Sequence, residues 1–208
     1  IELLAVYTYP AQVTFCTKAL GSLRDLAGRR VRISSPSQAD WVSALGAIPV
    51  NTGFAEIVAN VRSGNIDCAI TGTMSGNTIG LDQVTSHLHT MPVTWGLAAF
   101  VANGAAWHAL TPSLQQLLRR ELPKLEEAIW AESAAETGLG IACDIGAPAC
   151  TGGRKGSMTE VPATAADTRA RRAILIDKVL PGWIQRCGSQ CARVWSQTIG
   201  PSSGIALP

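Results

Sequence analysis

Residues 22–71 begin with SLRDLAGRRVRISSP (22–36) and end with GNIDCAIT (64–71). Val31 and Ile33 alternate with Arg32, as in a strand, and two further short apolar runs follow. Helical spacing of apolar residues separates the runs, and Gly46 and Gly64 are positioned to end the two helices. A βαβαβ unit, with a parallel sheet and helices packed on it, is the simplest fold for this pattern. The expected strands are 31–33, 48–50 and 66–71, and the expected helices are 39–45 and 54–61.

Polar and aromatic residues fall where these strands end. Ligands of open α/β sheets bind in the crevice beyond the carboxyl ends of the strands. Arg32, Phe54 and Thr71 lie at or near that edge. A fixed cation, an aromatic face and a hydroxyl group suit a small organic anion, although the spacing alone also allows Arg32 to be an ordinary surface residue.

The segment TGTMSGNTIG (71–80) predicts a polar, glycine-rich loop just past the third strand. Thr73, Ser75 and Asn77 offer small donors and acceptors for further ligand contacts. The order Gly-x-x-Ser-Gly differs from the Gly-x-Ser-x-Gly of a hydrolase elbow, and no histidine or acid is positioned as a partner of the serine. No catalytic residue and no enzymatic activity are therefore expected.

The composition excludes several classes of function. The chain has 208 residues and a formal net charge of +2, and its arginines are scattered, so nucleic acid is not an expected partner. The cluster of Arg169, Arg171 and Arg172 is typical of a solvated helix face. No apolar run reaches membrane-spanning length, so any association with a membrane is expected to be peripheral.

The six cysteines indicate the compartment. Cys143–Cys150 and Cys187–Cys191 read as two local disulfides, which points to an oxidising compartment such as the periplasm. A four-cysteine zinc site is the alternative, but its spacing is irregular. Cys16 and Cys68 are expected to be buried thiols. His87 and His89 alone are a weak metal signal, so no metal site and no cofactor are expected.

Three segments in order resemble a known family: SLRDLAGRRVRI (22–33), LGAIPVNTGFAEIVANVRSGNIDCAIT (45–71) and VANGAAWHALTPSLQQLL (101–118). They are similar to the DctP-like solute-binding subunits of tripartite ATP-independent periplasmic (TRAP) transporters. Order and spacing agree together over about residues 21–118, which makes the resemblance specific. The matching positions are Asp25, Gly28, Arg32, Leu45, Gly46, Pro49, Glu56, Gly64, Asp67, Asn103, Trp107, Leu110 and Gln115.

The resemblance implies a carboxylate site between two α/β lobes. Arg32 stands where the family has the arginine that pairs with the ligand carboxylate, a match that a planar guanidinium makes with two parallel hydrogen bonds. Phe54 is the aromatic position that packs on the ligand, and Thr71 ends the third strand. Gln12 stands where relatives have another polar or basic contact, so a second fixed positive charge is absent and a sialic-acid-like ligand is disfavoured. Trp95 is a candidate cleft or hinge residue, or an ordinary core residue.

The resemblance also implies a domain organisation. The fold class is α/β, with periplasmic-binding-protein-like (type II) lobes, a βαβαβ unit, a long spine helix and an incomplete first lobe in this chain. Thr111 and Pro112 begin the spine helix, which reaches Thr137–Gly138 and is kinked or divided at Pro123. The expected divisions are 1–9, a hinge strand left from the first lobe; 10–97, the second lobe; 98–137, the return segment and spine helix; and 138–208, a helical region with disulfides.

The expected function is a periplasmic solute-binding protein that delivers a small organic acid to the membrane permease subunits of a TRAP transporter. A signal peptide is expected to have been removed by processing. The alternative, from another class, is a stand-alone sensor or interaction module that kept the fold and lost transport. The residues leave the identity of the acid open.

Overall fold

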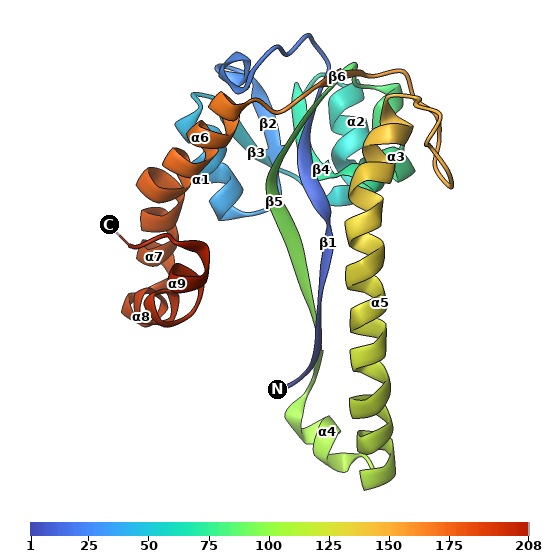
Figure 1. Ribbon diagram of the computed structural model, residues 1–208, viewed down its shortest axis with the longest axis vertical. Coiled ribbons are helices and arrows are strands. Elements are labelled where there is room, and N and C mark those ends of the chain that lie inside the picture. Colours follow the sequence, from blue (N-terminus) through green and yellow to red (C-terminus); the bar gives the residue numbers. More distant parts are fainter. Residues whose placement is uncertain (208) are drawn as a thin grey trace.

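In the computed structural model, which describes residues 1–207, six strands form one mixed sheet in the order β3-β2-β4-β1-β5-β6 (Figure 1). The three strands expected from the βαβαβ pattern lie parallel to one another at one side of the sheet, and β1 runs antiparallel to both of its neighbours. The strands are β1 (Glu2–Cys16), β2 (Arg30–Ile33), β3 (Ile48–Asn51), β4 (Cys68–Gly72), β5 (His87–Ala102) and β6 (Thr159–Val161).

Helices connect the strands and cover both faces of the sheet. The α-helices are α1 (Pro36–Ala44), α2 (Ile57–Arg62), α3 (Thr73–Ile79), α4 (Gly104–Ala109), α5 (Pro112–Asp144), α6 (Ala165–Ile174), α7 (Leu180–Cys187), α8 (Ser189–Gln197) and α9 (Ile199–Ser203). Short turns of other helix types are η1 (Leu23–Leu26), η2 (Phe54–Glu56), η3 (Leu81–Gln83) and η4 (Leu175–Val179), the last being π-helical.

Side chains alternate between the two faces of the sheet and contribute to a separate hydrophobic core on each face. Val31 and Ile70 face α1 and the C-terminal helices, where Trp41 packs with them. Phe15 and Ala69 face the opposite side, which is covered by α2, α3 and the upper end of α5. Because Arg32 follows Val31 and Thr71 follows Ile70, both polar residues face the second side, together with α2 and α3.

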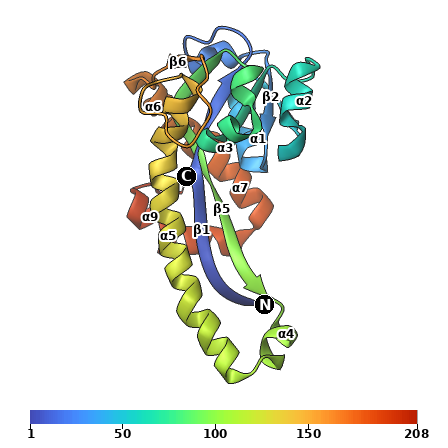
Figure 2. The ribbon, with the colours of Figure 1, turned by 90° about the vertical axis from the view of Figure 1, so that its right-hand side faces the viewer.

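Below this lobe, the first half of β1 and the second half of β5 continue as a two-stranded ribbon beside α5 (Figures 1 and 2). Here β1 has no strand on its second edge, and side chains of α5 satisfy its backbone instead. Glu126 accepts from the Val6 N–H at 2.7 Å, and Trp130 Nε1 donates to the Val6 carbonyl at 2.9 Å. Ser133 Oγ donates to the Thr8 carbonyl at 2.6 Å. The long helix α5 is thereby fastened along β1.

Two sequence-based predictions about this region are wrong. Alternation predicts a strand that ends at Tyr9, but β1 continues to Cys16 because it pairs with β4 and β5. Pro10 is tolerated because the register with β5 shifts between Thr8 and Ala11, and at such an irregularity the missing N–H of a proline disturbs the hydrogen bonds of the ladder least. The predicted loop over 71–80 is instead the helix α3, which packs on α5 and closes on Gly80 in the left-handed conformation.

The long helix agrees with its predicted start and exceeds its predicted end. Thr111 caps it by accepting from the Leu114 N–H, and Pro112 takes the first turn. The helix runs without a break through Pro123 to Asp144, so Pro123 does not divide it. The two turns of α5 beyond Thr137 pack against α3, and this packing extends α5 past the end that the sequence predicts.

The cysteines form three disulfides in the described residues. The structure pairs Cys143 with Cys150 and Cys187 with Cys191, the two pairs expected from their spacing. The expectation of free thiols at Cys16 and Cys68 is wrong, because these residues lie directly opposite each other in the β1–β4 ladder and are bonded. A separation of 52 residues hides this pairing from sequence inspection.

Candidate functional site

Arg32 lies on β2 at the carboxyl edge of the parallel strands and is 5% exposed. Its Nη1 donates to the Ile70 carbonyl at 2.8 Å and its Nε to the Thr52 carbonyl at 3.1 Å, so the ends of the neighbouring strands hold the guanidinium in place. Removal from water lowers the pKa of Arg32 from its ordinary value, although an arginine stays charged. The side chain is therefore a buried, oriented cation.

The guanidinium of Arg32 forms no ion pair with any carboxylate of residues 1–207. Its neighbour Arg30 differs, because Asp67 binds it with two hydrogen bonds of 3.0 and 2.8 Å. Arg32 Nη2 forms no hydrogen bond within the described residues and is not among the fully buried atoms without a partner, so it keeps some contact with solvent. This nitrogen is free to bind an anion.

Thr71 and Gln12 lie at the same edge of the sheet as Arg32, but on opposite faces. Thr71 is the penultimate residue of β4 and lies two residues after Ala69, the register partner of Arg32, so Thr71 and Arg32 point to the same side. Gln12 faces the side of α1, where its Oε1 accepts from Gln38 Nε2 at 2.5 Å. Gln38 in turn accepts from the N–H of Ser34. Thr71 therefore lies on the same face as Arg32, whereas Gln12 takes part in a hydrogen-bond network with α1.

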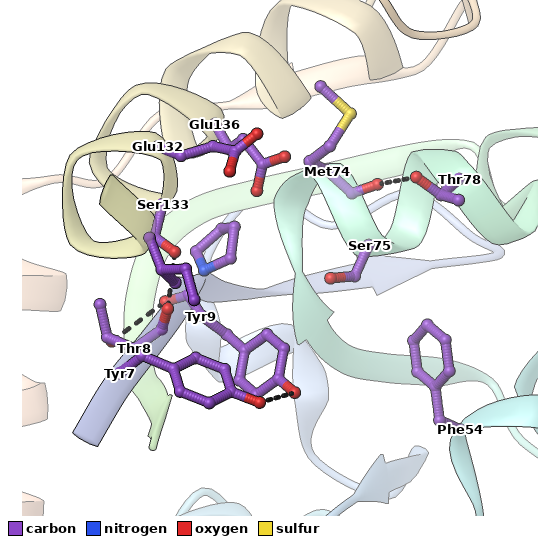
Figure 3. A pocket seen from close by; sticks show the side chains of 12 residues that line it. Tyr7, Thr8, Tyr9, Phe54, Met74, Ser75, Thr78, Glu132, Ser133 and Glu136 are labelled. Atoms are coloured by element: carbon purple, nitrogen blue, oxygen red, sulfur yellow. Dashed lines mark hydrogen bonds between the residues drawn. The ribbon is translucent and has the colours of Figure 1, made fainter. Parts of the chain in front are cut away.

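Phe54 and Ser75 line a pocket of about 350 Å³ between β1, α3 and α5 (Figure 3). Phe54 is 46% exposed, and it follows Thr52, the residue that accepts from Arg32, by two positions. The opposite walls carry Tyr7 and Tyr9 of β1, whose hydroxyl groups lie 3.4 Å apart. The pocket therefore adjoins the segment that anchors the Arg32 guanidinium.

Two tyrosines and two glutamates are among the residues of this pocket that escaped sequence analysis. Tyr7 and Tyr9 alternate on β1, and this periodicity is a signal that their side chains share one face. Glu132 and Glu136 lie one turn apart on α5 and also share a face. Burial, and secondarily the charge of Glu132, raises the pKa of Glu136. Only the folded chain shows that the two pairs line the same pocket.

Thr73 and Asn77 do not line this pocket. Thr73 is fully buried, and its hydroxyl group donates to the Glu136 carbonyl at 3.1 Å. Asn77 Nδ2 donates to Asp144 at 3.1 Å and to the Arg154 carbonyl at 2.8 Å, and its Oδ1 accepts from the Arg154 N–H. Both side chains hold α3 against α5 and the following loop. Their predicted ligand contacts find no support in this geometry.

Trp95 lies on β5 opposite Ala11 and is 49% exposed. It lines two other cavities, one of about 520 Å³ with Tyr9 and Trp130, and one of about 790 Å³ beside the C-terminal helices. It does not line the pocket of Phe54. The structure therefore places Trp95 on the β1–β5 ribbon and outside the core, at a cavity that it shares with Ser35 and Gln38.

The two strand histidines are not arranged around a metal site. His89 is buried, and its Nε2 lies 3.5 Å from Asp167 Oδ2. Burial lowers the pKa of His89 despite this carboxylate. Within residues 1–207, no three His, Cys, Asp or Glu side chains are grouped so that they could hold a metal ion. In the same residues, no helix is both long and apolar enough to cross a bilayer.

Comparison with known proteins gives this geometry a context. The family model of the bacterial extracellular solute-binding proteins, family 7 (DctP), matches residues 1–138. The chain belongs to this family. The resemblance inferred from the sequence is therefore confirmed, and the DctP family is one of solute-binding proteins and not of enzymes.

Solved structures of similar fold agree with the DctP assignment. They include a TRAP solute-binding protein from Desulfovibrio salexigens with bound orotic acid (TM-score 0.86, 16% identity, covering 99% of this chain and 63% of that one). A second is the periplasmic ectoine-binding protein of Halomonas elongata (TM-score 0.80, 20% identity, covering 94% of this chain and 62% of that one). A third is DctP7 of Bordetella pertussis, which binds pyroglutamic acid (TM-score 0.76, 20% identity, covering 90% of this chain and 59% of that one). The predicted α/β, periplasmic-binding-protein-like fold class is confirmed. This chain spans about three fifths of the length of each of these proteins.

Proposed function

We propose that this chain belongs to the solute receptor of a TRAP transporter and captures a small organic anion, with Arg32 pairing with its carboxylate. The observation that carries this proposal is the buried Arg32 guanidinium, which has no carboxylate partner in residues 1–207. A buried charge without a counter-ion is unfavourable. A carboxylate would supply the missing negative charge and would form charge-assisted hydrogen bonds with the guanidinium.

The neighbourhood of Arg32 supports a small acid with some apolar surface. Phe54 offers an exposed ring and Ser75 a hydroxyl group in the adjoining pocket. Thr71, on the Arg32 face, is the proposed additional contact, whereas Gln12 faces α1 and acts at most by positioning Gln38. The ligands of the similar structures are small molecules of this size class, among them pyroglutamic acid and orotic acid.

The proposed mechanism is closure of two lobes around the ligand, after which the permease recognises the closed form. In this view residues 1–9 and 98–137 form the hinge and spine, 10–97 form the second lobe, and 138–208 form the disulfide-bearing helical region. The hydrogen bonds between α5 and β1 support such coupling, because they tie the spine to the hinge strand. Three disulfides support a periplasmic location.

Substitution of Arg32 tests the proposal. The assay is calorimetry of the complete protein against malonate, mandelate, orotate and pyroglutamate. Arg32→Ala should weaken the binding of whichever acid binds by about 30-fold or more, since breaking a desolvated charge pair costs about 2–5 kcal/mol. Arg32→Lys should recover part of the affinity, because a lysine keeps the charge but loses the two-pronged geometry.

Arg30→Ala is the matched control, because it removes a guanidinium from the same strand that already has Asp67 as its partner. It should leave the affinity within about twofold. Thermal unfolding of each variant shows whether the fold persists. Unchanged affinity in a folded Arg32→Ala variant would remove Arg32 from the site.

A further inference from the structure

The pocket at Phe54, which Arg32 adjoins through Thr52 but does not itself line, combines two carboxylates with three aromatic rings. Glu132 and Glu136 lie on its α5 wall, Tyr7 and Tyr9 on the hinge strand, and Phe54 on η2 (Figure 3). The two glutamates are spaced i, i+4 on one helix, which places them on the same face. The negative charges are therefore directed into one cavity of about 350 Å³.

The charge of this pocket is not neutralised by the described residues. No arginine, lysine or histidine lines it. Neither Glu132 nor Glu136 forms an ion pair within residues 1–207, whereas Glu121, on the same helix, is paired with Arg120 and Lys124. The raised pKa of Glu136, due to burial and the neighbouring charge, is consistent with a missing positive partner.

Two separate features support a ligand at this cavity. Phe54 and Tyr9 are each 46% exposed, and aromatic faces beside carboxylates attract a desolvated cation. Arg32, 95% buried with an unpaired Nη2, contacts the carbonyl of Thr52, two residues before Phe54. An anion-binding group and a cation-binding pocket thus meet at residues 52–54.

We propose that the ligand is a small zwitterion of the amino-acid type, whose carboxylate binds Arg32 and whose ammonium group is received by Glu132 and Glu136 among the aromatic rings. This inference rests on the proposed function and narrows its substrate class. A simple anion would leave the two glutamates unpaired and would add a third negative charge close to them. An ammonium group offers each carboxylate a charge-assisted hydrogen bond.

The test compares hydroxy acids with the amino acids that differ only by an ammonium in place of the hydroxyl group. Calorimetry at neutral pH measures malate against aspartate, mandelate against phenylglycine and lactate against alanine on the complete protein. In the best-binding pair, the amino acid should bind about tenfold or more tightly, which corresponds to one charge-assisted contact of about 1.4 kcal/mol.

The variants Glu132→Gln and Glu136→Gln, separately and together, remove the charges and keep the shape. The double variant should erase the preference for the amino acid and leave the affinity for the hydroxy acid equal or higher. Glu127→Gln is the matched control, since Glu127 lies on the same helix and does not line the pocket. It should leave the preference unchanged.

The outcomes separate this inference from the proposed function. If a hydroxy acid binds at least as tightly as its amino acid, or if the double variant keeps the full preference, the zwitterion inference is overturned. The proposed function still stands in that case, provided that Arg32→Ala abolishes binding of the hydroxy acid. If no acid of either kind binds, both fail.

Discussion

Asp144, at the end of α5, is a buried carboxyl group whose titration should be visible in the stability of the whole protein. It is fully buried, its Oδ1 accepts from Asn77 at 3.1 Å, and its Oδ2 has no hydrogen-bond partner in the described residues. Asp82 nearby also has a buried oxygen without a partner. Burial, opposed by the Asn77 hydrogen bond and reinforced by the charge of Asp82, raises the pKa of Asp144 to about 7.

The direction of the pH dependence follows from the linkage between proton binding and folding. The folded state holds the Asp144 proton up to a pH of about 7, whereas the unfolded chain releases it near 3.9. The resulting stability is fully present below pH 3.9 and is lost as the pH rises through 7. The gap between the two pKa values amounts to about 4 kcal/mol in the free energy of unfolding, of which about 3 kcal/mol is lost between pH 5 and pH 8.

Asp144→Asn removes this dependence, because an amide stays neutral and keeps the oxygen that accepts from Asn77. Urea unfolding at pH 5, 6, 7 and 8 should show the variant gaining on the unsubstituted protein by about 3 kcal/mol across the range. Taking the difference between the two proteins cancels other titrating groups, such as His89. Asp177→Asn, at an exposed position, is the control and should show no gain. Parallel stability curves for Asp144→Asn and the unsubstituted protein would refute the reasoning.

Two further predictions concern the covalent and close-packed parts of the lobe. Replacing both Cys16 and Cys68 with alanine should lower the free energy of unfolding by about 4 kcal/mol, because the disulfide restricts the unfolded chain over a 52-residue separation. The double replacement of Cys187 and Cys191 should lower it by about 2 kcal/mol, because the closed loop is much shorter. Equal losses for the two double variants in urea unfolding would contradict this reasoning. Gly140→Ala should cost about 3 kcal/mol or more, because the new methyl group would meet the backbone of Thr73 and Met74 at 2.5 and 2.3 Å. Gly138→Ala on the same helix meets nothing within 4 Å and should raise the melting temperature slightly, so a similar loss at both glycines would show that close α3–α5 packing is not the cause.

The candidate site was only partly predictable. The positions of Arg32 and Phe54 could be predicted because Arg32 lies near the end of one strand and Phe54 shortly after another, and local periodicity reveals both strands. Thr73 and Asn77 were chosen for their chemistry, but the fold uses them to attach α3 to α5. Tyr7, Glu132 and Glu136 come from segments more than a hundred residues apart, and nothing in the sequence near either segment shows that they share a pocket.

Signals between near neighbours in the chain determined the secondary structure of the βαβαβ unit and the starts of the helices. The strand of Val31 and Ile33, the left-handed turn at Gly46 and the cap at Thr111 all agree with the structure, since each depends on a few adjacent residues. The tertiary structure alone decided where β1 ends, that Thr73–Ile79 form a helix, and that Cys16 is bonded to Cys68. These features depend on strand pairing and on packing between distant segments, and their free energy arises only once the chain has brought those segments together.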